Sequence, residues 1–115
     1  MALGAVRTVL PSSARTASGN SGGVGLAVDG ASQVAVGVSV TAVSGVSPTL
    51  DVALQWSHDG GTTWLPAQSA DSFTQVTAVA GAVKVFDVKG PWLRAAYTIA
   101  GTTPSFTFSV TAVGL

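Results

Sequence analysis

Hydrophobic residues alternate with small or polar ones along two stretches near the middle of the chain. From Val34 to Val40 every second residue is valine, and residues 49–57 place leucine, valine and tryptophan at alternate positions. A period of two matches the alternating faces of a β-strand and not the 3.6-residue period of a helix. Each stretch is therefore predicted to be a strand with one face in the core.

Segments of similar composition extend this prediction along the chain, and turn sequences rich in glycine, proline, serine and aspartate separate them. The expected strands are residues 6–10, 24–28, 33–43, 49–57, 72–79, 82–88, 92–99 and 105–113. The expected turns are residues 29–30, 44–48, 59–61, 80–81, 89–91 and 101–104. Helical periodicity is nearly absent between them. We therefore expect an all-β fold, an antiparallel β-sandwich or barrel of about eight strands with an extended N-terminal arm.

The segment 11–23, PSSARTASGNSGG, differs from the rest because it is small, polar and without a hydrophobic face. It is predicted to be a long loop or an extended arm. This divides the chain into residues 1–23, an N-terminal strand and arm, and residues 24–115, the β-sandwich domain. Residues 1–28 contain Arg7 and Arg15 but no acid, which favours an arm that binds a partner over a mobile surface loop.

Charge is sparse. The chain has five Lys and Arg residues, five aspartates and a formal net charge of zero, so that 9% of its residues are charged. A low charge favours a protein that covers part of its surface with a partner or with copies of itself, although a small domain made soluble by Ser and Thr is the alternative. Dispersed cations argue against nucleic acid, and no apolar run is long enough to span a membrane.

One short sequence pattern is specific for a known type of turn. The sequence from Ser57 to Trp64, SHDGGTTW, matches S-x-D-x-G-x-T-W and resembles the Asp-box of sialidases and related β-propellers. It predicts a folded hairpin turn that is structural and not catalytic. The turn residues are Ser57, Asp59, Gly61, Thr63 and Trp64. The pattern occurs once in 115 residues, which are too few for a propeller.

Neither catalysis nor a cofactor is expected. His58 is the only histidine, the aspartates show no metal-ligand spacing, and there is no cysteine. Trp56 is in register with the core positions and Trp64 belongs to the turn. Trp92 and Arg94 remain as a candidate exposed binding pair, which would suit a small glycan-binding module.

The C-terminal half of the chain carries a broader resemblance. LQWSHDGGTTWLP, followed by a strand pair and then GPWLRAAYTIAGTTPSFTFSVTAVG, is similar to small β-sandwich structural proteins of tailed bacteriophages. The residues that carry it after the hairpin are Arg94, Tyr97, Gly101, Pro104, Ser105, Phe106, Phe108 and Val110. The resemblance implies a virion structural protein, and it implies no catalytic residues.

Within that group we expect a capsid decoration protein that is made in the host cytoplasm and binds the outer shell of the virion in many copies. Its expected partners are the major capsid protein and copies of itself, with a homotrimer suited to local three-fold positions. Arg7, Val9, Leu10 and Arg15 are the candidate contacts to the shell or to a neighbour. A tail or head–tail connector subunit and a glycan-binding module are the alternatives.

Overall fold

The computed structural model describes residues 5–25, 31–66 and 69–115. Within them the chain is all-β, and the strands form one antiparallel sheet of six. The elements are β1 (Val6–Arg15), β2 (Gly19–Asn20), β3 (Val24–Gly25), β4 (Gln33–Ser57), a 3-10 turn at Ser69–Asp71, β5 (Ala80–Asp87) and β6 (Trp92–Gly114). The strand order is β1-β6-β4-β5, and β2 and β3 also pair with β6. The sheet is therefore open, with β1 and β5 at its edges.

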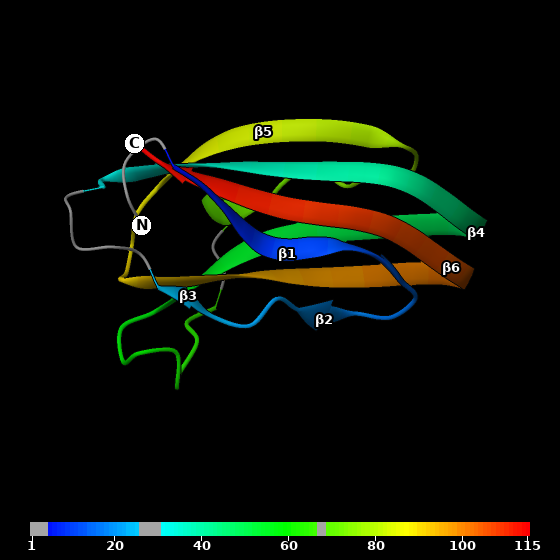
Figure 1. The fold of residues 1–115 in the computed structure, drawn as a ribbon. Coiled ribbons are helices and arrows are strands. Elements are labelled where there is room, and N and C mark those ends of the chain that lie inside the picture. Colours follow the sequence, from blue (N-terminus) through cyan, green and yellow to red (C-terminus); the bar gives the residue numbers. More distant parts are fainter. Residues whose placement is uncertain (1–4, 26–30, 67–68) are drawn as a thin grey trace.

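Two long strands organise the sheet. β4 and β6 contain 25 and 23 residues and pair along their whole length, from Val34 with Gly114 to Ser57 with Trp92. Figure 1 shows two layers of strands, and each long strand passes from one layer to the other: β4 runs from the upper layer into the lower, and β6 runs from the lower layer into the upper. The upper layer of Figure 1 holds β1, β5, residues 33–43 and residues 105–114; the lower layer holds β2, β3, residues 49–57 and residues 92–100. The sheet is thus folded back on itself.

The fold-back occurs where both strands carry the same short sequence, Gly-x-Ser/Thr-Pro. Gly45 and Gly101 have φ values of 109° and 122°, and Ser47 and Thr103 both have a φ of 49°. The ladder shifts register here between Ser44 and Thr49 but continues on the other side. Residues 44–48 and 101–104 are therefore bends inside strands, and not the turns between separate strands that the sequence predicts.

The core lies between the two layers. Val34, Val36, Val38 and Val40 from the upper layer, and Leu50, Val52, Leu54 and Trp56 from the lower, are all buried. Phe106, Phe108 and Val110 are fully buried as well. The two-residue period predicted which side chains of these strands face the core. This prediction is confirmed, because the buried residues are the alternating hydrophobic ones.

The count of about eight strands is wrong, since the ranges 33–43 and 49–57 are one strand, as are 92–99 and 105–113. Both partners bend together, so pairing is not broken. The range 72–79 is not a strand either; within it only Ser72 and Val76 form isolated bridges, to Ala53 and Leu50. Ala80 and Gly81 belong to β5. The predicted strand 24–28 is β3 at its start, and its remainder and the turn 29–30 lie outside the described residues.

The N-terminal segment is not a projecting arm. Residues 11–15 belong to β1, which pairs with β6 from Phe106 to Val113, while β2 and β3 pair with β6 between Trp92 and Tyr97. The segment therefore follows β6 around its bend and forms an edge of the sheet in both layers. Pairing through the backbone requires no hydrophobic face, which is why the polar composition of this segment is compatible with it.

Candidate functional site

The Asp-box sequence forms the predicted turn. The Ser57 hydroxyl donates to Asp59 Oδ1 at 2.8 Å and accepts the Gly61 N–H at 2.9 Å, and Asp59 Oδ1 also accepts the Thr63 N–H at 2.8 Å. Gly60 and Gly61 both have positive φ, at 77° and 90°. The Thr63 N–H and the Ser57 hydroxyl lower the pKa of Asp59 to about 2. These side chains are occupied in holding the turn, which supports a structural assignment.

Trp64 extends from this turn towards the candidate pair Trp92 and Arg94. The Arg94 guanidinium lies 4.8 Å from the centre of the Trp64 ring, and Arg94 Nε donates to Gln55 Oε1 at 2.7 Å. A Cβ placed on Gly23 would be 2.8 Å from Trp64 and 3.4 Å from Trp92, so both indoles pack against that glycine. Both are half-buried. The candidate binding site predicted from the sequence, Trp92 with Arg94, therefore also includes the indole of Trp64.

A buried ionic contact was missing from the sequence-based prediction. Asp71 is 1% exposed, accepts the Trp56 Nε1–H at 3.3 Å and forms an ion pair of 2.7 Å with Lys89 Nζ. His58 Nε2 lies 2.7 Å from the Lys89 carbonyl oxygen, so the loop after β5 is attached at two points. An aspartate at the end of a single 3-10 turn has no periodicity that marks it as buried. Among the described residues, no three His or Asp side chains are grouped to hold a metal ion.

The predicted N-terminal contacts divide into two kinds. Val9 and Leu10 are buried in the chain's own core, because the register shift between Thr8 and Leu10 turns two successive residues inward. They do not form an exposed contact surface, and that part of the prediction is wrong. Arg15 donates to the carbonyl oxygens of Phe108 and Pro11 at 2.9 and 2.7 Å. Arg7 is exposed on β1.

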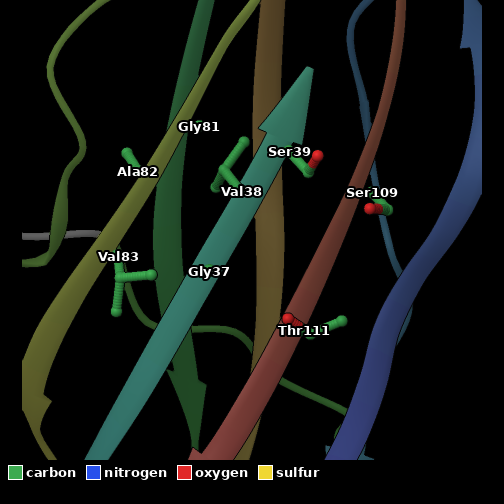
Figure 2. A pocket seen from close by; sticks show the side chains of 8 residues that line it. All are labelled: Gly37, Val38, Ser39, Gly81, Ala82, Val83, Ser109 and Thr111. Atoms are coloured by element: carbon green, nitrogen blue, oxygen red, sulfur yellow. The ribbon is translucent and has the colours of Figure 1, made fainter. Parts of the chain in front are cut away.

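A further exposed feature lies on the outer face of the upper layer. Its centre is a shallow hollow of about 350 Å³ over β4, bounded by β5 and β6 (Figure 2). The hollow exists because Gly37 and Gly81 have no side chains, and Val83 stands at its edge, 77% exposed. Six residues that line it are Gly37, Ser39, Gly81, Val83, Ser109 and Thr111. None is charged. We call these six residues the outer hollow.

Comparisons of the chain with protein-family models, with curated proteins and with solved structures find no match. In the described residues, no helix has the length and apolar character required to cross a membrane.

Proposed function

We propose that this chain is a virion structural protein of a tailed bacteriophage, and specifically a capsid decoration protein that binds the outer shell in many copies. The observation that carries the proposal is the outer hollow, whose six residues are all uncharged. A contiguous face of glycine, serine, threonine and valine loses little on desolvation when another protein covers it, because no charge has to leave water.

Exposed valines favour a covered state. Val83, which belongs to the outer hollow, and Val85, two residues further along β5, are 77% and 49% exposed. Burying such side chains against a partner is favourable by about 25 cal/mol per Å² of apolar surface. A single small contact is weak. A shell presents the same site hundreds of times, and subunits that also contact one another on it are held by many such contacts together.

The polar contacts of the described residues support a binding role over catalysis. Asp59 holds the turn, and Asp71 is paired with Lys89 and accepts the Trp56 indole N–H. Both carboxylates are engaged in structural hydrogen bonds, whereas a catalytic pair requires a free group that faces a substrate. A folded sheet with an uncharged hollow on its outer face suits a subunit that binds one site on a shell and remains bound.

The test is binding to empty, expanded capsids of a phage that encodes the chain. The purified protein is mixed with capsids that lack it, and bound protein is separated by sedimentation. We expect saturable binding and a higher temperature of capsid disruption. Ser39→Lys places a charge in the outer hollow and is expected to weaken binding about tenfold or more.

Ser44→Lys is the matched control, because Ser44 is an exposed serine of the same strand that lies at the bend, outside the outer hollow. It is expected to bind as the unchanged protein does. A protein that stays in the supernatant overturns the decoration role. Assembly of the chain into rings or tubes without capsids would instead support a tail or connector subunit.

A glycan-binding module is the second candidate, and the contact of two indoles at Gly23 favours it. Aromatic faces stack on sugars, and an arginine beside them donates hydrogen bonds to hydroxyl groups. Arg94 covers part of the Trp64 ring, however, which reduces the free indole face. Titration with oligosaccharides, followed by tryptophan fluorescence in the unchanged protein and in Trp92→Ala, distinguishes this candidate: a saturable shift that Trp92→Ala abolishes supports it.

A further inference from the structure

One edge of the sheet is left open along β5. In the order β1-β6-β4-β5 this strand is last, and it pairs with β4 from Ala80 to Asp87. No described residue pairs with its other side. The N–H and C=O groups along that side are a template for adding another strand, since an unpaired edge gains a full ladder of hydrogen bonds when it is covered.

The edge formed by β1 is protected against pairing with a further strand, whereas the edge formed by β5 is not. β1 has register shifts after Thr8 and after Leu10 and contains Pro11, all of which interrupt pairing. β5 pairs with β4 without a shift and contains no proline. Its central charge is turned away from the edge, because Lys84 Nζ donates to the Ser72 carbonyl oxygen in the lower layer at 2.9 Å. An edge without bulges or proline, and with exposed valines, is therefore available.

We propose that this edge pairs with a second copy of the same chain, β5 antiparallel to β5, about a two-fold axis perpendicular to the sheet. The two upper layers then form one continuous sheet. Such an axis keeps each face on its own side, so that outward residues oppose outward residues. The exposed side chains of Val83 and Val85 become cross-strand neighbours of the second copy and lose much of their contact with water.

Charge and overlap select the register. Pairing centred on Val83 places Val85 opposite Gly81 of the second copy and Lys84 opposite its Ala82, and it pairs residues 80–86 of β5. Pairing centred on Lys84 has the same overlap but opposes two ammonium groups, which is unfavourable. Pairing centred on Val85 leaves the first residues of β5 unpaired. The register centred on Val83 is therefore the favoured one.

This contact goes beyond the decoration role and does not depend on it. A strand that pairs antiparallel with itself stops at two chains, so the proposed species is a dimer, in contrast to the homotrimer expected from the sequence. The shell-binding test uses Ser39, which lies on β4 and outside the β5 edge. Failure of one test is thus distinguishable from failure of the other.

The mass in solution is the first test. Sedimentation equilibrium of the full chain is expected to give two chains. Val83→Lys opposes two ammonium groups at the axis and is expected to shift the equilibrium to monomer by at least about tenfold. Val46→Lys is the matched control, because Val46 is 67% exposed at the bend, away from β5, and it is expected to remain dimeric. A monomeric or trimeric unchanged chain, or a dimeric Val83→Lys, overturns the proposal.

Disulfide cross-linking tests the register. The chain has no cysteine, so an introduced thiol is unique. Directly opposed residues of antiparallel strands have Cα atoms about 4.5–5.5 Å apart, within the range of a disulfide. Oxidised Val83→Cys is expected to form a covalent dimer. Val85→Cys alone is not, but it is expected to link to Gly81→Cys when the two variants are mixed. Val85→Cys linking to itself, or Val83→Cys failing to link, contradicts the register.

Discussion

Gly45 and Gly101 occupy equivalent places on the two strands of the bend, and each lies against the backbone of the other strand. A Cβ on Gly45 would be 2.7 Å from the Thr103 carbonyl oxygen, and a Cβ on Gly101 would be 2.9 Å from Pro48 Cα. The two strands can therefore fold back together only if both positions lack a side chain. The fold-back is specified locally by two glycines.

Gly45→Ala and Gly101→Ala are each expected to lower the free energy of unfolding by about 2–4 kcal/mol, because positive φ and a backbone clash act together. Gly60→Ala is the control: its φ is 77°, but a Cβ there meets nothing within 4 Å. It is expected to cost about 1 kcal/mol. Urea unfolding measures all three. Equal losses for Gly60→Ala and Gly45→Ala would show that the close approach at the bend is unimportant.

The turn at Asp59 is expected to make stability depend on pH in acid. The pKa of Asp59 is lowered from 3.8 to about 2 in the folded chain, so its stabilising contribution is complete above pH 4 and is lost as the pH falls through 2. Asp59→Asn removes this contribution and is expected to flatten the curve of unfolding free energy between about pH 4 and pH 2. Urea unfolding at a series of pH values checks it. Superimposable curves for the two proteins would contradict the prediction.

The ion pair of Lys89 with Asp71 is expected to matter for stability. Lys89→Met leaves a buried carboxylate with the Trp56 indole as its remaining partner and is expected to cost about 2–3 kcal/mol. Lys84→Met is the control, because Lys84 is an exposed lysine whose ammonium donates to a backbone carbonyl. Its expected cost is below about 1 kcal/mol. Denaturant unfolding compares the two variants, and an equal effect of both would contradict this account.

The N-terminal strand is expected to behave as part of the core. Leu10→Ala removes a buried side chain and is expected to cost about 2–4 kcal/mol, whereas Arg7→Ala, at an exposed position of the same strand, is expected to cost less than about 1 kcal/mol. Thermal unfolding followed by circular dichroism measures both. A Leu10→Ala protein as stable as the unchanged chain would restore the interpretation of this segment as a separate arm.

Alternation predicted the inward rows of β4 and β6 because burial follows side-chain identity residue by residue. It did not predict that both long strands continue through the bend, because Gly-x-Ser/Thr-Pro normally ends a strand and only the equivalent bend in the partner allows pairing to resume. The pairing of residues 13–15 and 19–20 with β6 was missed for a related reason, because backbone pairing leaves no hydrophobic pattern.

The candidate sites were predictable to different degrees. The turn from Ser57 to Thr63 was predicted from the sequence, since the hydrogen bonds that hold it join residues at most four positions apart. The contact of Trp64 with Arg94 and the ion pair of Asp71 with Lys89 join residues far apart along the chain, and neither has a local signature. The outer hollow depends on Gly37 and Ser109 lying on adjacent strands, which requires knowledge of strand order and register.

The pairing of β4 with β6 also determines how this chain must fold. Its innermost pair, Ser57 with Trp92, closes the loop that contains β5, and each later pair towards Val34 and Gly114 joins residues further apart in sequence. Contact order is therefore high, and chains of this kind fold on a scale of about milliseconds to seconds. If β4 and β6 first pair next to the Asp-box turn, the shortest and least costly loop closes first. The pairing would then extend through the bend at Gly45 and Gly101.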